Sequence, residues 1–172
     1  MTIRRNFTAE QLREIIAYDP ATGIFVWLPR SGRPNFNGQY AGKEAGALVC
    51  NGSGNTYKMI GAFGQRYMAH ILAHLYVTGV WPEAYIDHID RNGLNNSWAN
   101  LRLATPKQNA ANSKRYSTNS SGCKGVSYSK SHKKWRSTYG RLWLGQFNTK
   151  EEAQEAYIAK AKELHGEFAR TE

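Results

Sequence analysis

Apolar positions along the first thirty residues predict a short helix followed by a strand. A capping box at Thr8 and Gln11 begins the helix, and Tyr18-Asp19-Pro20 is expected to end it. The apolar stripe of this helix consists of Leu12, Ile15 and Ile16. A turn then leads to a strand at 24–28, so the chain opens with a helix, a reversal and an extended segment.

The next fifty residues mix extended and helical patterns. Residues 30–46 are rich in Gly, Pro and Asn, which indicates a loop. The segments 47–50 and 57–62 are expected to pair as a hairpin, and a helix at about 67–78 ends before Gly79. Short strands alternating with short helices indicate an α+β fold.

A stretch of small polar residues divides the chain into two parts. The run 117–122, Ser-Thr-Asn-Ser-Ser-Gly, has the composition of a linker. We therefore expect one domain at 1–114, a linker at 115–121 and a second domain at 122–172. The second domain shows three strand-like segments and one helix, at 125–128, 134–137, 142–145 and 149–164.

The charge pattern points to an anionic partner. The formal net charge is +10, and no acidic residue occurs between Asp90 and Glu151. Twelve basic residues lie in that interval: Arg91, Arg102, Lys107, Lys114, Arg115, Lys124, Lys130, Lys133, Lys134, Arg136, Arg141 and Lys150. Ordinary protein surfaces mix positive and negative charges, so a stretch without acidic residues favours binding to a polyanion. Nucleic acid is the first candidate, and a membrane surface is the second.

The positions of the cysteines and the hydropathy of the chain further limit the class of protein. Cys50 and Cys123 are far apart and form no CxxC pair, which argues against a structural zinc site and against disulfide dependence. No apolar run approaches the roughly 20 residues that a membrane-spanning helix needs, and the N-terminus lacks a signal-peptide pattern. We expect a protein of a reducing compartment, the cytoplasm of a host cell.

The segment 85–112 holds the densest polar chemistry. Asp87 and His88 are adjacent, and Asp90-Arg91-Asn92-Gly93 is a turn signal that reverses the chain. A neutral histidine can deprotonate a water molecule, and carboxylate and amide oxygens suit a hard divalent cation. On spacing alone, a phosphodiester-cleaving site and a hydrogen-bonded loop core both remain open.

A second polar segment follows closely. Thr105 and Pro106 are expected to cap and begin a helix at about 105–113, which carries Asn109. Upstream, His70 and His74 are one helical turn apart, but no acidic residue stands between them as in HExxH sites. We expect His70 to pack under the site or to touch a phosphate rather than to bind a metal.

Together these segments resemble the HNH endonuclease motif, in the form found in phage and intron-encoded homing endonucleases. The motif residues are Asp87-His88-Ile89-Asp90, Asn92-Gly93-Leu94-Asn95-Asn96, Trp98-Ala99-Asn100-Leu101-Arg102 and Asn109, and the similarity extends over about residues 8–113. The resemblance implies a ββα-metal fold with His88 as general base and Asp87 and Asn109 as metal ligands. Asn100 would orient the loop and the base, and the ion would be Mg²⁺ or Mn²⁺ rather than zinc.

Residues 122–168 resemble the AP2 DNA-binding domain. The matching runs are Gly122-Cys123-Lys124-Gly125-Val126, Lys134-Trp135-Arg136, Arg141-Leu142-Trp143-Leu144-Gly145-Gln146-Phe147 and Glu151-Glu152-Ala153. The resemblance implies a three-stranded antiparallel sheet on one helix, with the outer sheet face toward DNA. Including the basic residues before this domain, the expected DNA contacts are Lys107, Lys114, Arg115, Lys124, Lys134, Arg136, Arg141 and Trp143.

Two features depart from the AP2 pattern. Only five residues separate Arg136 from Leu142, so the second and third strands should be short or their hairpin distorted. Ser127 and Ser129 stand where many members carry arginine, which indicates weaker base readout and a grip directed mainly at phosphates.

These observations predict a metal-dependent, site-preferring DNA endonuclease, a nickase or a double-strand cutter of the phage mobile type. Its partner is double-stranded DNA, with no membrane and no obligate protein partner. One active site per chain favours a monomer. The alternatives are a DNA-binding regulator with a degenerate nuclease domain, and an RNA-binding protein.

Overall fold

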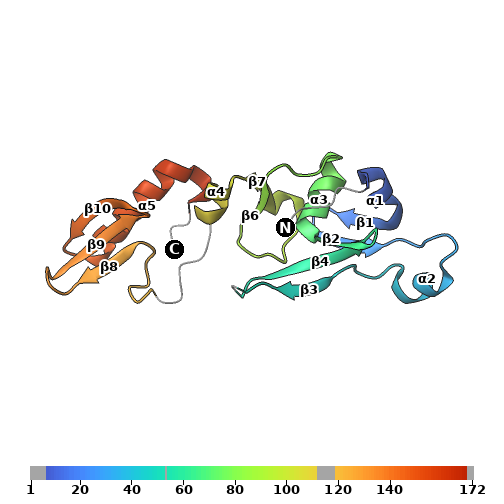
Figure 1. Ribbon diagram of the computed structural model, residues 1–172, viewed down its shortest axis with the longest axis horizontal. Coiled ribbons are helices and arrows are strands. Elements are labelled where there is room, and N and C mark those ends of the chain that lie inside the picture. Colours follow the sequence, from blue (N-terminus) through green and yellow to red (C-terminus); the bar gives the residue numbers. More distant parts are fainter. Residues whose placement is uncertain (1–6, 53, 112–118, 170–172) are drawn as a thin grey trace. The chain divides into compact units, whose positions relative to one another are not determined.

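The computed structural model describes residues 7–52, 54–111 and 119–169. The chain divides into two units, Met1–Ala104 and Thr105–Glu172, each with its own core (Figure 1). The division falls before α4, because this helix contacts α5 and η2 of the C-terminal unit. The linker expected at 115–121 stays a prediction, since most of it lies outside the described residues.

The first helix is shorter than its apolar stripe suggested. α1 (Ala9–Ile15) begins with the expected capping box of Thr8 and Gln11. Ile16, expected in the helix, instead has extended backbone angles and begins β1 (Ile16–Asp19), which pairs antiparallel with β2 (Ile24–Trp27). The expected helix end at Tyr18-Asp19-Pro20 is therefore wrong, because residues 16–19 pair with β2 instead of continuing the helix.

The segment expected as a loop contains a helix, and the following hairpin has a third strand. α2 (Pro34–Tyr40) starts with a proline in its first turn and has no side-chain cap, which left little sequence signal for it. β3 (Ala47–Cys50), β4 (Thr56–Ala62) and β5 (Gln65–Met68) form one antiparallel sheet in that order. α3 (Ala69–Thr78) starts two residues later than expected and ends at Gly79, which has φ 80°.

The core of the N-terminal unit lies where α1, α3 and the strands meet. Its largest fully buried apolar side chains are Leu12, Ile16, Phe25, Ile60, Leu72 and Leu75. Phe7 adds an aromatic cluster, with its ring centroid 4.2 Å from that of Phe63 and 5.1 Å from that of Trp81. This packing provides the rigid support for the polar hairpin that follows.

The polar segment folds as a strand, a long loop, a strand and a helix. β6 (Tyr85–His88) pairs antiparallel with β7 (Leu101–Ala104), and η1 (Trp98–Asn100) leads into β7. α4 (Pro106–Ala111) follows directly. Its capping by Thr105 is confirmed, because the backbone N–H of Gln108 donates to Thr105 Oγ1 at 3.3 Å and Gln108 Oε1 accepts from the Thr105 backbone.

The C-terminal unit has the three-stranded sheet and helix that the sequence predicted. β8 (Val126–Ser129), β9 (Lys134–Tyr139) and β10 (Leu142–Phe147) form an antiparallel sheet in the order β10-β9-β8. α5 (Lys150–His165) has the expected capping box of Thr149 and Glu152, and η2 (Gly166–Phe168) follows it. The core contains Cys123, Val126, Trp135, Phe147, Ala153 and Tyr157.

The β9–β10 hairpin shows how the chain accommodates the short spacing between Arg136 and Leu142. Both strands are six residues long, so the expected shortening is wrong. Only Gly140 and Arg141 connect them, with Gly140 at φ 59°, which leaves the other residues free to pair. The irregularity takes the form of a bulge between Trp143 and Gly145.

Candidate active site

The β6–β7 hairpin places an aspartate and a histidine side by side in a buried position. Asp87 and His88 are the last two residues of β6, and each residue is only 6% exposed. In the strand register Asp87 faces Arg102 and His88 faces Leu101. Because burial of two ionisable groups is unfavourable without compensation, their partners define what the site can do.

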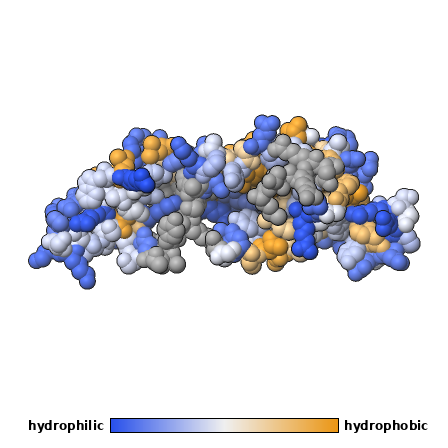
Figure 2. Space-filling view, viewed as in Figure 1, coloured by the Kyte–Doolittle hydropathy of each residue, from blue (hydrophilic) through white to orange (hydrophobic). Residues whose placement is uncertain are grey.

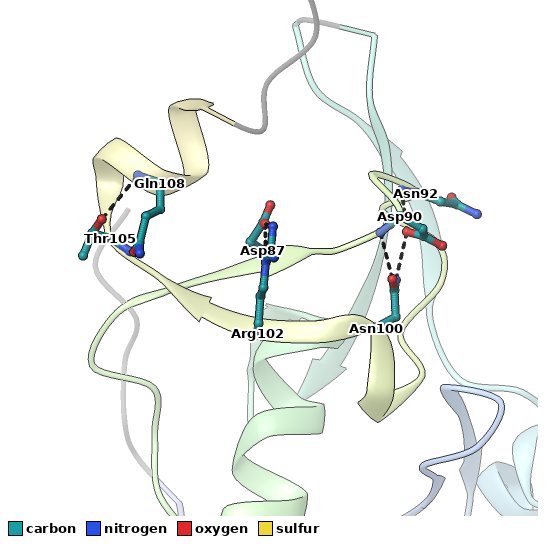
Figure 3. A network of polar contacts seen from close by, with 7 residues as sticks. All are labelled: Asp87, Asp90, Asn92, Asn100, Arg102, Thr105 and Gln108. Carbon is teal, nitrogen blue, oxygen red and sulfur yellow. Dashed lines mark hydrogen bonds and ion pairs between the residues drawn. The ribbon is translucent and has the colours of Figure 1, made fainter. Parts of the chain in front are cut away.

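Asp87 is held by a cross-strand ion pair (Figure 3). The Arg102 Nε atom donates to Asp87 Oδ2 at 3.0 Å, and Nη2 lies 3.0 Å from the same oxygen. Both side chains are largely buried, at 13% and 7% exposure. Arg102 therefore fixes the carboxylate through Oδ2, while Oδ1 is outside this pair. The sequence indicates Arg102 as a basic residue of the motif but gives no direct sign of this ion pair, which depends on the antiparallel pairing of Asp87 with Arg102.

His88 is oriented by Asn96. The Nε2 atom of His88 lies 3.2 Å from Asn96 Oδ1, and Asn96 is only 1% exposed. The amide orientation of Asn96 is fixed by its Nδ2 group, which donates to the Leu94 carbonyl at 3.2 Å. Nε2 of His88 therefore carries the proton, and the lone pair is on Nδ1. The sequence indicates Asn96 only as a residue of the motif, so its contact with His88 was missed.

Asn100 ties the loop together behind His88 (Figure 3). Its Oδ1 accepts from the Asp90 backbone N–H, and its Nδ2 donates to Asp90 Oδ1 at 2.9 Å and to the Asn95 carbonyl at 2.8 Å. Its carbonyl accepts from the Ile89 N–H at 2.9 Å, next to His88. The side chain of Asn100 hydrogen-bonds to the loop, whereas that of Asn96 contacts the imidazole of His88.

The N-terminal β1–β2 hairpin supports the loop between β6 and β7. The Tyr18 hydroxyl donates to the Asn96 carbonyl at 2.7 Å, and the Trp98 N–H donates to the Pro20 carbonyl at 2.8 Å. Gly23, with φ +76°, lies so close that a Cβ there would come within 3.0 Å of Asn96 and Ser97 backbone atoms. Residues about eighty positions apart thus hold the loop that orients His88.

β4 and α3 close the other sides of the site. Gly93 approaches β4 so closely that a Cβ would meet the Thr56 carbonyl and the Tyr57 ring within 3.0 Å. The His70 ring lies edge to face with the His88 ring, at a centroid distance of 5.0 Å. His70 thus packs against the site as we expected. His74 instead hydrogen-bonds Thr78 and the Val80 carbonyl, as a structural residue.

Burial keeps both histidines neutral near physiological pH. Burial lowers the pKa of His88, while the Asn96 hydrogen bond and the charges of Asp90 and Asp87 act in the opposite direction. Burial, and secondarily His88, lowers the pKa of His70 to about 3. Burial acts to raise the pKa of Asp90, but hydrogen bonds from Asn92, Asn95 and Asn100 outweigh it and lower that pKa. The site thus combines a neutral imidazole with the anionic carboxylate of Asp90.

No ready-made protein cage for a metal exists in the described ranges. Among the residues that the structure describes, no three His, Cys, Asp or Glu side chains gather closely enough to hold an ion. Asp87 and His88 lie in the N-terminal unit, whereas Asn109 lies on α4, where it is exposed and its N–H donates to the Thr105 carbonyl at 2.9 Å. The convergence of Asn109 on Asp87 therefore stays a prediction.

The expected DNA contacts of the C-terminal unit fall largely on one sheet face. Trp135, Ser137 and Tyr139 of β9 point toward α5, with the Tyr139 ring 5.2 Å from that of Tyr157. By strand alternation, Lys134 and Arg136 point the other way, and the register places Trp143, 53% exposed, on their side. Figure 2 shows that the visible surface of this unit is mainly hydrophilic.

The remaining expected contacts are placed differently. Arg141 lies in the β9–β10 turn, Lys124 precedes β8, and Lys107 is an exposed residue of α4. Lys114 and Arg115 lie outside the described residues. Ser129, where an arginine was noted as common, is buried and lies 3.1 Å from His132 Nδ1, to which Arg136 Nη2 donates at 3.2 Å. Ser129 thus supports the position of Arg136.

Comparison with known proteins identifies both units. The profile described as HNH endonuclease matches residues 67–111, and the AP2 domain profile matches residues 121–167. Protein 3.8 of Escherichia phage T7 is 41% identical over 105 residues, which cover 59% of this chain and 87% of that protein. The chain belongs to the HNH endonuclease family.

A second relative of this HNH endonuclease is also viral. An uncharacterised HNH endonuclease of Acanthamoeba polyphaga mimivirus is 39% identical over 110 residues, which cover 62% of this chain and 57% of that protein. No solved structure matches the chain. No helix in the described part is long and apolar enough to span a bilayer. The HNH and AP2 domains imply DNA as the partner of this endonuclease.

Proposed function

We propose that this HNH endonuclease is a metal-dependent, site-preferring enzyme that hydrolyses phosphodiester bonds of double-stranded DNA. The observation that carries the proposal is the buried Asp87–His88 pair, whose two side chains are each fixed by a separate partner. A loop core without chemistry would not need a neutral imidazole held in one tautomer beside an oriented carboxylate. The arrangement supports proton transfer next to an anionic oxygen ligand.

His88 acts as the general base in this proposal. Because Nε2 donates its proton to Asn96, Nδ1 is the atom that accepts a proton from water. The lowered pKa of His88 keeps its imidazole in the neutral form at neutral pH. General-base catalysis of this kind contributes about 10²- to 10⁴-fold in rate. Asn100 holds the surrounding loop through Asp90 and Asn95 and so preserves the geometry.

The donor set fits a hard divalent cation. Asp87 would supply a carboxylate that Arg102 holds through Oδ2, and Asn109 would supply an amide oxygen. Mg²⁺ is commonly held by one or two carboxylates, with water and substrate phosphates completing its shell. When bound, Mg²⁺ or Mn²⁺ neutralises charge that develops on the cleaved phosphate and the leaving oxygen.

The AP2 unit supplies the grip that makes cutting site-preferring. Lys134, Arg136 and Trp143 on the outer sheet face are the residues that we propose for DNA contact, with Arg141 and Lys124 beside them. Phosphate contacts fix position, and base-edge contacts add preference. Both matched relatives are viral, so we further propose a phage-encoded, mobile-type endonuclease that acts in the host cytoplasm as a monomer.

A supercoiled-plasmid assay tests the proposal. The purified chain is incubated with plasmid in Mg²⁺, Mn²⁺ or EDTA, and the products are resolved as supercoiled, relaxed and linear forms. Relaxed or linear DNA with either ion, and none with EDTA, is the expected result. Cleavage that persists in EDTA would contradict the role of the metal. Absence of cleavage both on plasmid and on DNA flanking the protein's own gene would contradict the nuclease function.

A further inference from the structure

A guanidinium group stacked on two aromatic rings lies outside the active site and outside the AP2 unit. Arg30 follows β2, and its Cζ atom is 4.0 Å from the Phe36 ring centroid and 5.0 Å from that of Trp27. The two rings meet edge to face at 5.8 Å. In Figure 1 this segment lies at the end of the N-terminal unit occupied by α2. Such stacking leaves the edge N–H groups of arginine available for an anion.

The backbone at this arginine is also fixed. The Arg30 N–H donates to Asn37 Oδ1 at 2.7 Å, and Asn37 Nδ2 donates to the Arg30 carbonyl at 2.8 Å. The side chain is therefore held at its base by Asn37 and along its plane by the two rings. A preorganised group loses less conformational entropy when it binds a ligand.

The charge of Arg30 is not neutralised by a carboxylate in the part of the chain that the structure describes. In the described ranges no carboxylate forms an ion pair with it, and its buried Nε has no hydrogen-bond partner. Burial, followed by the positive charge of Arg33, lowers the pKa of Arg30. Partial burial of a cation without an acidic partner is unfavourable unless a bound anion compensates its charge.

The surrounding sequence keeps acids away from this region. Between Asp19 and Glu83 the only acidic residue is Glu44, and Lys58 forms an ion pair with it. The basic residues of the same stretch are Arg30, Arg33, Lys43, Lys58 and Arg66. Lys43 is exposed, and its carbonyl accepts from the Trp27 N–H at 3.0 Å, which places it next to the aromatic base of the site.

Another stacked arginine of the same unit shows the contrast. Arg13 lies 5.3 Å from the Tyr76 ring centroid, but its Nη1 pairs with Glu10 at 3.4 Å and its Nη2 donates to the Tyr76 carbonyl. Its hydrogen-bonding and charge requirements are thus met within the protein. Arg13 therefore offers a matched control for stacking without a free positive charge.

We propose that Arg30 binds a backbone phosphate of duplex DNA, with Arg33 and Lys43 adding local positive charge. The nuclease unit then grips DNA by a contact of its own, in addition to the AP2 unit. The inference rests on the proposed function in one respect, that DNA is the bound substrate. The bidentate geometry of a guanidinium suits a phosphate with two free oxygens.

The salt dependence of DNA binding tests this site. Affinities of the full-length wild type, Arg30→Met, Arg30→Lys and Arg13→Met for a labelled duplex are measured in EDTA over a range of NaCl concentrations. Loss of one phosphate contact lowers the slope of log K against log salt by about 0.9 in magnitude. Arg30→Met is expected to show this loss, whereas Arg30→Lys and Arg13→Met keep the wild-type slope. An unchanged slope in folded Arg30→Met overturns the proposal.

A measurement on the wild type guards against a folding defect of the variants. Arginine-specific modification by phenylglyoxal is followed residue by residue with and without saturating duplex. DNA is expected to slow the modification of Arg30 and to leave that of Arg13 unchanged; equal rates at Arg30 overturn the proposal. Wild type that fails to bind duplex at all would contradict the proposed function itself, whereas binding without Arg30 contradicts only this inference.

Discussion

The Nε2 atom of His88 lies 3.2 Å from Oδ1 of Asn96, and both side chains are buried. This contact sets which imidazole nitrogen holds the proton and therefore which one can take a proton from water. It also links His88 to the N-terminal hairpin, because the Asn96 carbonyl accepts a hydrogen bond from the Tyr18 hydroxyl at 2.7 Å. The imidazole of His88 is thus positioned by residues from distant parts of the sequence.

Replacement of Asn96 tests this positioning role. Asn96→Ala leaves the buried Nε2 proton of His88 without its acceptor, a defect of about 1–3 kcal/mol. We expect the single-turnover cleavage rate at saturating DNA to fall by about 10²-fold, as for other misplaced catalytic groups, with DNA affinity retained. Asn96→Asp keeps an acceptor oxygen and should cleave faster than Asn96→Ala. Equal rates for Asn96→Ala and wild type would rule out the role.

A pair of glycine substitutions separates close packing from backbone strain. Gly23 and Gly64 have nearly the same φ, +76° and +75°, but only Gly23 approaches other backbone atoms, those of Asn96 and Ser97. Both alanine variants should lose about 1 kcal/mol from the left-handed conformation. The free energy of unfolding of Gly23→Ala should fall by roughly a further 1–3 kcal/mol because of overpacking, and this variant should also cleave more slowly. Thermal melts and cleavage rates check this, and equal behaviour of the two variants would contradict it.

His70, whose Nδ1 atom is buried, makes stability depend on pH. Its pKa is about 3 in the folded protein against 6.5 for the free side chain. Between these values the unfolded state binds a proton that the folded state does not, so the free energy of unfolding should fall as pH falls from 6.5 toward 3. Thermal melts at pH 7 and pH 5 should show a smaller decrease for His70→Asn than for wild type. The same decrease in both proteins would contradict the assignment of this pH dependence to His70.

Removal of the C-terminal module tests its role as a DNA anchor. Deletion of residues 117–172 removes the outer sheet face with Lys134, Arg136 and Trp143. We expect weaker duplex binding that requires low salt, with a smaller slope of log K against log salt because several phosphate contacts are lost. A truncated chain that binds as tightly as the full chain would show that the module is not an anchor.

The sequence predicted those parts of the site that lie within one continuous motif. Asp87 and His88 could be found because they are adjacent, and the capping boxes at Thr8 and Thr149 were correct because each lies within four residues. The Tyr18–Asn96 contact spans 78 positions and leaves no local signal. α2 lacked a cap, and Ile16 left the helical stripe because pairing with Trp27 outweighed helical periodicity. The local sequence pattern thus predicts the chemical groups of the site more readily than the long-range contacts that hold them in place.

The most direct test of the account compares cleavage and binding in one His88 variant. Wild type, His88→Ala and a control variant in the C-terminal unit, His165→Ala, are assayed on the same duplex, for single-turnover cleavage with Mg²⁺ and for affinity in EDTA. We predict that His88→Ala cleaves at least about 10²-fold more slowly while binding nearly as tightly as wild type, and that His165→Ala does both normally. Cleavage by His88→Ala at the wild-type rate, or an equal loss of cleavage and binding, would contradict the assignment of His88 as the base.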